Sequence, residues 1–235
     1  AQNFVIVFED LGAGSDYAFI SQSGQAIVAD EARELLHYLS VLHRTAPNAH
    51  GEPFPSNLPL RRLNHEHIFN FPFQPNNGFD LDAIQPGLAA LAHPLQVDDV
   101  LKAKITALGD LYLGSGTGLV HGDFYPGSWL RTASGIKVID PEFAHVGHAE
   151  FDVGVMTAHL LMAGETPTSI KATLNPYQKQ DGFDDAHCTG FCGVEILRRL
   201  LGVAQLPLDL DLAEKRALID LAKKFIHAPA SHELF

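Results

Sequence analysis

The sequence is poor in cysteine, in basic residues and in long apolar runs, and each shortage excludes a class of protein. Its two cysteines, Cys188 and Cys192, are too few for a disulfide scaffold or a four-thiolate zinc site, and they favour a reducing compartment. No apolar run approaches the ~18 residues of a membrane-spanning helix, and no basic N-terminal segment with a cleavage site indicates a signal peptide. We therefore expect a cytoplasmic protein with no membrane partner.

Basic residues are outnumbered: 28 aspartates and glutamates face 16 lysines and arginines, which gives a net charge of −12. A negative field repels nucleic acid and anionic membrane surfaces, so we expect neither as the main partner. The 235 residues are 46% hydrophobic and 19% charged, as is typical of a globular chain with one large domain or two small ones. A local basic cluster that binds a small anion remains compatible with this composition.

Hydrophobic periodicity predicts a mainly helical chain with a few short strands. The predicted helices cover residues 30–44 with Asp30 as N-cap, 81–95, 97–113, 151–163, 192–201 and 212–227, and Pro94 divides the second from the third. The predicted strands are 4–8, 118–120 and a hairpin of 129–131 with 136–139. Residues 12–15 and 114–118 are interpreted as turns, and residues 47–75 as mostly loop with room for one short helix. The pattern predicts an α+β fold, mainly helical, with one small hairpin.

Three carboxylates gather at the ends of predicted strands between residues 120 and 143. Asp123 follows strand 118–120, Ser128 begins the hairpin, and Asp140 and Glu142 follow its second strand. Because the hairpin folds back on itself, we expect Ser128 and Asp140 to face each other. This all-oxygen set suits Mg²⁺, which takes phosphate oxygens as further ligands. Asp123 is then free to orient a hydroxyl for attack, which is the division of labour in phosphoryl transfer.

Longer motifs around these residues resemble those of a known family. The run His121-Gly122-Asp123 with Ser128, followed by Ile139-Asp140-Pro141-Glu142-Phe143, is similar to the catalytic loop and metal motif of methylthioribose kinases. Those kinases are relatives of aminoglycoside phosphotransferases and choline kinases. Two further stretches support the resemblance: Arg62-Leu63-Asn64-His65-Glu66-His67-Ile68-Phe69 and Gly193-Val194-Glu195-Ile196-Leu197-Arg198-Arg199.

The resemblance implies a protein-kinase-like fold and a role for each acid. Asp123 would be the catalytic base or the group that orients the substrate hydroxyl. Asp140 and Glu142 would hold Mg²⁺, with Ser128 assisting. ATP would be the co-substrate, and the acceptor would be a small sugar, methylthioribose or a related molecule.

The resemblance also implies roles away from the metal. Glu9, Asp10 and Leu11 would form a hinge that offers backbone groups to the adenine of ATP. Arg198 or Arg199 would contact substrate hydroxyls or the transferred phosphate. Because adjacent residues point to different sides of a helix, we expect only one arginine to serve the site and the other to be a surface charge.

His121 and Asp152 would brace the catalytic loop, with Asp152 accepting backbone N–H groups of the loop. Asp152 could also cap the helix that begins near it, and the two roles are compatible. The segment His65-Glu66-His67 is interpreted as packing or as a wall of the site rather than as zinc ligands, because two histidines two residues apart diverge on a helix.

The chain matches only part of the family's expected fold. Strand 4–8 corresponds to the last strand of an N-terminal lobe, and the first lysine is Lys102, so no phosphate-binding lysine precedes that strand. We therefore expect residues 1–235 to form a C-terminal lobe, with 1–12 as the last N-lobe strand and hinge, and 118–143 as the catalytic loop and metal hairpin.

The leading hypothesis is an ATP- and Mg²⁺-dependent small-molecule kinase. The alternative is a catalytically impaired kinase-like module that binds a ligand, or that pairs with a second copy or a partner chain through the edge of strand 4–8. A metal-dependent hydrolase is a third hypothesis.

Overall fold

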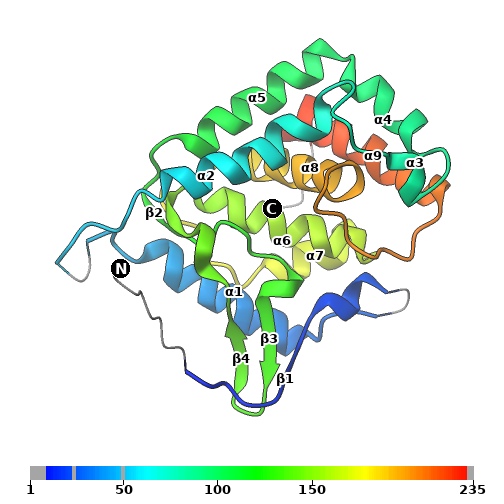
Figure 1. Cartoon of the computed structure of the whole chain (residues 1–235). Helices are drawn as coiled ribbons and strands as arrows, with labels where there is room; N and C mark the ends of the chain where they lie inside the picture. Colours follow the sequence, from blue (N-terminus) through cyan, green and yellow to red (C-terminus); the bar gives the residue numbers. More distant parts are fainter. Residues whose placement is uncertain (1–8, 23–24, 49–50, 232–235) are drawn as a thin grey trace, which may run out of the picture.

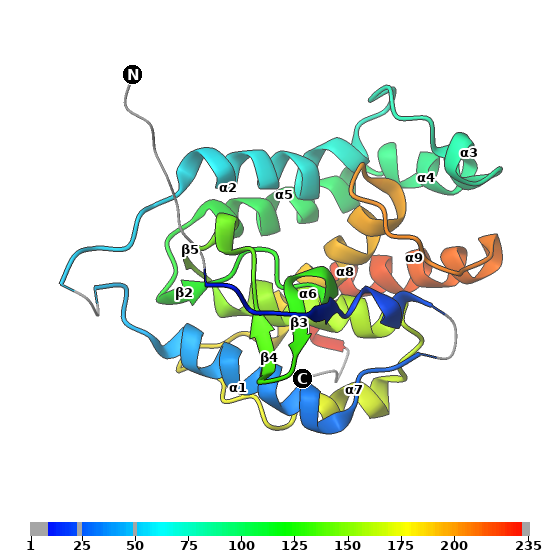
Figure 2. The same ribbon diagram turned by 60° about the horizontal axis from the view of Figure 1, so that its bottom comes forward.

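The computed structural model describes residues 9–22, 25–48 and 51–231. The predicted strand 4–8, with the edge expected to pair with another chain, lies outside these described residues and stays a prediction. Figure 1 and Figure 2 show helices packed around a central pair, with a small hairpin lying beside the first helix. Across the described residues, no helix has both the length and the apolar character needed to span a bilayer.

Helices supply most of the described structure. The α-helices are α1 (Ala29–Arg44), α2 (Leu58–His65), α3 (Leu81–Ile84), α4 (Leu88–Gln96), α5 (Asp99–Leu113), α6 (Ala149–Met162), α7 (Pro167–Leu174), α8 (Asp185–Leu201) and α9 (Leu212–His227). Short turns of 3₁₀ helix are η1 (Ala18–Ser21), η3 (Phe71–Phe73), η4 (Pro126–Ser128), η5 (Pro141–Phe143) and η6 (Pro229–Ser231), and η2 (Glu66–Asn70) is a π-helical turn that continues α2.

The strands form two small antiparallel sheets. One has the order β1-β3-β4, from β1 (Gly14–Asp16), β3 (Trp129–Thr132) and β4 (Gly135–Val138). The other pairs β2 (Gly118–Val120) with β5 (His145–Gly147). The hairpin and the strand at 118–120 are therefore confirmed, and so is the mainly helical α+β class.

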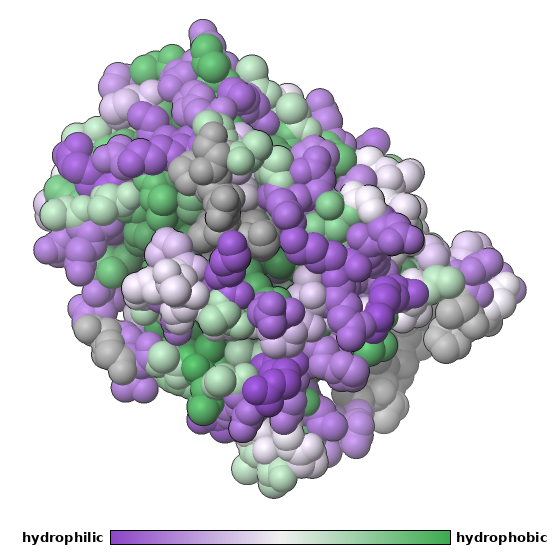
Figure 3. Space-filling model, turned by 180° about the vertical axis from the view of Figure 1, so that it is seen from behind, coloured by the Kyte–Doolittle hydropathy of each residue, from purple (hydrophilic) through white to green (hydrophobic). Residues whose placement is uncertain are grey.

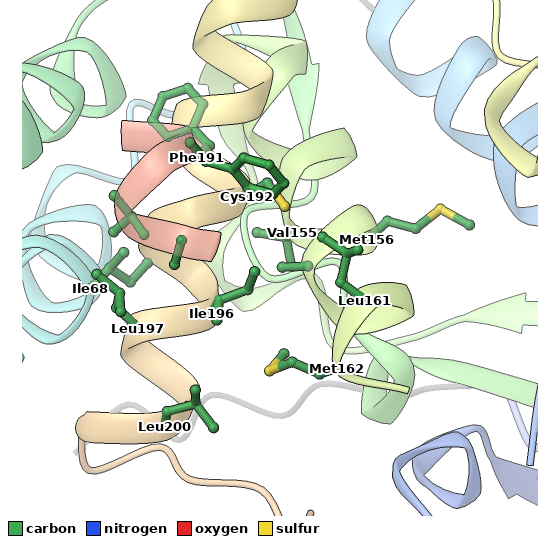
Figure 4. Packing of buried hydrophobic residues seen from close by; sticks show 14 of the residues in the cluster. Ile68, Val155, Met156, Leu161, Met162, Phe191, Cys192, Ile196, Leu197 and Leu200 are labelled. Carbon is green, nitrogen blue, oxygen red and sulfur yellow. The ribbon is translucent and has the colours of Figure 1, made fainter. Parts of the chain in front are cut away.

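The core lies where α8 packs against α6 and α9. Every residue of α6 is buried, and so is α8 from Cys188 to Leu201. Figure 4 shows Ile196 of α8 and Val155 of α6 among the side chains between these helices, with Ile68 of η2 against the other side of α8. Burial of each such side chain contributes ~1.5–3 kcal/mol, so this packing fixes α8 firmly. The face seen in Figure 3 is mostly hydrophilic, with hydrophobic residues in scattered patches.

Two predicted helix boundaries are wrong. Helix α1 starts at Ala29 after Val28, so Asp30 lies inside the first turn, where its carboxylate accepts from Arg33 at 2.7 Å. Pro94 lies inside α4, so the predicted break falls slightly later, at 97–98, and a further break at 85–87 separates α3 from α4. Gly87, with φ of +92°, starts α4 in a conformation that favours glycine, and Asp98 caps α5 by accepting from the backbone N–H of Leu101 at 3.0 Å.

Three other elements differ from the predicted ones. Residues 14–16 form β1 instead of ending a turn, because they pair with β3. Helix α8 starts at Asp185, seven residues before the predicted start at 192, and Asp184 caps it. Strand β5 was not predicted, since His145-Val146-Gly147 has little apolar character and depends on its pairing with β2.

Candidate active site

The loop that follows β2 carries Asp123, and a buried carboxylate holds its backbone. Asp152 of α6 is fully buried and accepts the N–H of His121 at 2.6 Å and the N–H of Gly122 at 3.0 Å. Gly122 has φ of +84°, and a Cβ there would lie 2.4 Å from the carbonyl oxygen of Phe143. Only glycine allows both this backbone conformation and this close approach.

A histidine and a tyrosine complete the surroundings of Asp152. His43 Nε2 lies 3.1 Å from Asp152 Oδ2, and His43 Nδ1 lies 2.6 Å from the hydroxyl of Tyr177. Because a carboxylate only accepts, we assign the proton to Nε2, so that Nδ1 accepts from Tyr177. Burial by itself would raise the pKa of Asp152, but the hydrogen bonds that it accepts from His43 and from the backbone N–H of His121 hold it below its ordinary value. Asp152 is not the N-cap of α6, which is His148.

His121 joins the loop that follows β2 to the end of the hairpin. Its Nε2 lies 3.0 Å from the carbonyl oxygen of Ile139, and its Nδ1 lies 3.4 Å from the backbone N–H of Asp123. The carbonyl only accepts, so Nε2 carries the proton and Nδ1 accepts. One imidazole thus fixes Asp123 relative to the residue before Asp140.

Ser128 also links the two segments. Its backbone carbonyl accepts from the N–H of Ile139 at 2.9 Å, which places it opposite the residue before Asp140. Its hydroxyl donates to the carbonyl oxygen of Asp123 at 3.0 Å, and the residue is buried. The hydrogen of this hydroxyl is therefore committed to the loop, while its lone pairs stay available.

Asp140 and Glu142 lie on the exposed side of this junction. Both are exposed, and within the described part of the chain neither carboxylate makes a hydrogen bond or ion pair. Asp140 has φ of +64°, an uncommon conformation for a residue with a side chain. Asn57 holds the segment that follows by donating to the carbonyl oxygens of Glu142 at 2.7 Å and Ala144 at 3.0 Å.

This donor set fits a hard cation. Two free carboxylates and the oxygen of a hydroxyl are the ligands that Mg²⁺ takes when it also binds waters and phosphate. Within the described residues no group of three or more histidine, cysteine, aspartate and glutamate side chains forms a candidate metal site. Asp123, Asp140 and Glu142 therefore do not form one such cluster.

Asp123 binds both arginines of α8. Arg198 Nη1 and Arg199 Nη2 each lie 3.2 Å from Asp123 Oδ1. Both arginines are buried, with 5% of each residue exposed. The expectation that one of them would be a surface charge is wrong, because both reach the same carboxylate.

Glu195, one turn earlier on α8, holds the same two arginines. Its carboxylate accepts from Arg199 Nε at 2.6 Å and from Arg198 Nη1 at 3.1 Å, and His159 Nε2 lies 3.2 Å away. Burial would raise the pKa of Glu195, but the two arginines hold it well below its usual range. Burial lowers the pKa of His159, so this ring is neutral and donates to Glu195.

The predicted hinge lies apart from these contacts. Glu9 and Asp10 are exposed and Leu11 is half-buried. Asp10 accepts the backbone N–H of Gly12 at 2.9 Å, which shapes the chain just before β1. The structure thus joins Asp123 and its loop to His121, Ser128, Asp152, Arg198 and Arg199, and it places Asp140 and Glu142 at the exposed end of the hairpin. The adenine-binding role of 9–11 stays a prediction.

Several residues that shape the site were not predicted. Asn64 donates to the carbonyl oxygen of Gly122 at 3.0 Å, and Arg61 donates to the carbonyl oxygens of Tyr112 and Gly114 at 2.7 and 2.8 Å. The contact of Glu195 with the arginine pair could be predicted from the sequence, since it precedes the two arginines by three and four residues, the spacing of neighbours on a helix. His65 packs beside Phe69, with ring centroids 5.3 Å apart.

Comparison with known proteins identifies the family. The model of the phosphotransferase enzyme family matches residues 4–188, more than half of the chain. The chain belongs to this family. Within the phosphotransferase family, it is 33% identical to a methylthioribose kinase of Exiguobacterium sibiricum over 169 residues, 58% of this chain and 43% of that protein. It is 30% identical to a methylthioribose kinase of Bacillus cereus over 202 residues, 72% of this chain and 50% of that protein. The resemblance predicted from the motifs is confirmed.

The match to these relatives covers only part of their length. The chain spans about half the length of the curated relatives that it matches. Among solved structures, a choline kinase, LicA, from Streptococcus pneumoniae aligns with 94% of this chain and 69% of its own, at 14% identity and a TM-score of 0.47. A glucosamine kinase aligns with 96% of this chain and 50% of its own, at 17% identity and a TM-score of 0.30.

Proposed function

We propose that this phosphotransferase-family chain carries the catalytic half of an ATP- and Mg²⁺-dependent small-molecule kinase. The acceptor would be a sugar hydroxyl, most simply that of methylthioribose, because named methylthioribose kinases are among its relatives. One observation carries the proposal: Asp123 is fixed beside the residue that precedes Asp140, through His121 and Ser128. A hydroxyl-orienting acid and a metal-binding pair then lie on one surface.

The contacts of Asp123 assign different tasks to its two oxygens. Both arginines bind Oδ1, and within the described residues Oδ2 accepts no hydrogen bond. Oδ2 is therefore the atom that would accept the hydrogen of the acceptor hydroxyl and point its oxygen at the γ-phosphorus. Positioning of this kind supplies most of the catalysis in phosphoryl transfer.

The remaining residues have matching roles. Asp140 and Glu142, with Ser128, would hold Mg²⁺, and the ion would offset negative charge on the ATP phosphates. Asp152 and His121 keep the catalytic loop in one conformation. One of the arginines of α8 would contact the acceptor or the transferred phosphoryl group. The backbone at Glu9, Asp10 and Leu11 would face adenine.

Calorimetric titration of the chain with ATP, with and without Mg²⁺, tests the nucleotide and metal parts of this proposal. We expect binding only with Mg²⁺, and its loss in Asp140→Asn. Asp220→Asn, which changes an exposed aspartate of α9, is the matched control and should bind as the wild type does. Equal binding by Asp140→Asn and the control would contradict the metal assignment.

Transfer is tested by release of ADP in the presence of methylthioribose, with ribose and choline as competing acceptors. We expect ADP release that depends on methylthioribose and that falls at least ~10³-fold in Asp123→Asn, as for loss of a central catalytic group. Full activity in Asp123→Asn would contradict the proposed mechanism.

A second candidate is a catalytically impaired kinase-like module that binds a ligand or a partner chain. It predicts a stable dimer or complex, or nucleotide binding, without ADP release. Sedimentation of the purified chain, together with the transfer assay, separates the two candidates.

A further inference from the structure

Glu195 is buried, and within the described residues its carboxylate makes no hydrogen bond or ion pair with the loop that carries the proposed catalytic aspartate. Its residue is 1% exposed, and its bonds run to Arg198, Arg199 and His159. The arginines in turn reach Asp123. Glu195 thus acts on Asp123 through two intermediate side chains.

The spacing on α8 explains how one carboxylate holds two adjacent arginines. Residues of an α-helix are separated by about 100° around the axis, so positions three and four residues on lie on either side of the starting residue. Arg198 and Arg199 therefore flank the line of Glu195, and both side chains can turn toward it. Without that carboxylate, neighbouring arginines would diverge.

The charges of this group balance. Asp123 and Glu195 are negative, Arg198 and Arg199 are positive, and His159 is neutral. A balanced set can be buried, whereas removal of one member leaves an uncompensated charge. Arg199 is held further by the ring of Tyr125, 4.5 Å from its guanidinium carbon, and by the carbonyl oxygen of Ala204 at 3.3 Å.

We propose that Glu195 is a positioning residue of the phosphoryl-transfer site: it directs both arginines to Oδ1 of Asp123, which leaves Oδ2 for the acceptor hydroxyl. His159 supports this arrangement as a neutral donor to Glu195. The inference rests on the proposed function, because only in that reaction does the orientation of Asp123 matter. Its structural part, the ordering of two arginines by one glutamate, can be tested without any activity.

The structural test is the ¹⁵N spectrum of the arginine side chains. In the wild type, Nη–H signals of Arg198 and Arg199 should be resolved, because their bonds to two carboxylates slow rotation about Cζ–Nη. In Glu195→Gln these signals should broaden or vanish. Glu31→Gln is the matched control, since Glu31 binds Arg131 at 2.7 and 2.8 Å on another part of the fold. The control should leave the signals of Arg198 and Arg199 unchanged.

A milder variant covers the case in which Glu195→Gln fails to fold. His159→Phe keeps all four charges and removes one donor to Glu195. It should broaden the same arginine signals to a smaller extent. Unchanged signals in a folded Glu195→Gln, or in His159→Phe if only that variant folds, would overturn the inference.

The functional test is steady-state transfer to methylthioribose. Glu195→Gln should lower kcat by ~10²-fold, the scale of a displacement of about 1 Å in the site, while KM for ATP changes less than about twofold. In the double variant with Asp123→Asn, Glu195→Gln should add almost no further loss, because its effect passes through Asp123. Additive losses, or an unchanged kcat despite disordered arginines, would overturn the positioning role. A wild type without ADP release would refute the proposed function, and the arginine spectra would still decide the ordering.

Discussion

Replacement of Asp152 tests whether one buried carboxylate holds the catalytic loop. Three donors converge on it: the backbone N–H groups of His121 and Gly122, and His43 Nε2. Asp152→Asn keeps the shape but leaves only one accepting oxygen, and Asp152→Ala removes the acceptor altogether. We expect both variants to unfold more easily and to release the loop.

The magnitude follows from the number of donors. A hydrogen bond to a charged group contributes ~1.5–3 kcal/mol, and a buried donor left without an acceptor is costly. In Asp152→Asn the amide nitrogen must face at least one donor, so we expect a loss of ~2–3 kcal/mol in the free energy of unfolding. Asp152→Ala strands all three donors and should cost ~3–5 kcal/mol, because each buried donor without an acceptor costs ~1–3 kcal/mol.

Urea unfolding gives the free energies, and hydrogen exchange of the amides of His121 and Gly122 reports on the loop itself. These amides should exchange faster in both variants, whereas Asp220→Asn should change the free energy by less than ~0.5 kcal/mol. A loss under ~1 kcal/mol in Asp152→Ala, with unchanged exchange at His121 and Gly122, would refute the reasoning.

The dependence on pH provides a separate check on Asp152. Its pKa is lower in the folded chain than the ordinary value, because the surrounding bonds outweigh burial. The unfolded chain therefore binds the proton more tightly, so this contribution to stability is present above a pH of ~4 and is lost as the pH falls through the lower folded pKa. Asp152→Asn should flatten that acid limb.

Three further predictions concern the surroundings of the loop. Burial lowers the pKa of His145 to about 4, below the ~6.5 of an unfolded chain, so the unfolded state takes up the proton first as the pH falls. Between pH 6.5 and 4, the free energy of unfolding of the wild type should therefore fall by up to ~3 kcal/mol because of this residue, and that of His145→Phe should not. Urea unfolding at a series of pH values measures the difference. Gly122→Ala should lower the free energy of unfolding by more than ~2 kcal/mol, because its new Cβ would meet Phe143. Gly164 has a similar φ but nothing within 4 Å of a Cβ, so Gly164→Ala should lower it by only the ~1–2 kcal/mol of the left-handed conformation. Thermal unfolding of the two variants compares them. Asn57→Gly keeps a permissive backbone but removes two bonds to the segment 142–144, and should cost ~1–2 kcal/mol and weaken Mg²⁺–ATP binding in calorimetry.

Local sequence predicted the parts of the site that local physics determines. The hairpin was predictable because Ala133-Ser134-Gly135 is a turn between two short β-prone runs, and Gly135 adopts φ of +100°. Strand β5 depends on its partner β2, and no pattern within its own three residues indicates it. The early start of α8 was missed because its first residues are polar, although Asp184 was present as an N-cap signal.

The prediction that only one of Arg198 and Arg199 would be buried was wrong for a more general reason. A helical wheel assigns faces from the direction of the Cα–Cβ bond, and long side chains can leave that direction when a partner draws them. Glu195 lies between the two arginines on the helical wheel, so both of their side chains can bend toward its carboxylate and bind it. Burial of the pair could be inferred from Glu195 only together with the position of Asp123, which is distant in sequence.

The balance of charge at the site also bears on its dependence on metal. The group of Asp123, Glu195, Arg198 and Arg199 is neutral as a whole, so it contributes little net attraction for a phosphate. Asp140 and Glu142 are exposed and add two negative charges at the end of the hairpin, in a chain whose net charge is −12. On the proposed function, ATP without a metal would meet net repulsion here, and a divalent cation on the two carboxylates would cancel it. On the proposed function, a requirement for Mg²⁺ would therefore follow from how the arginines are already paired.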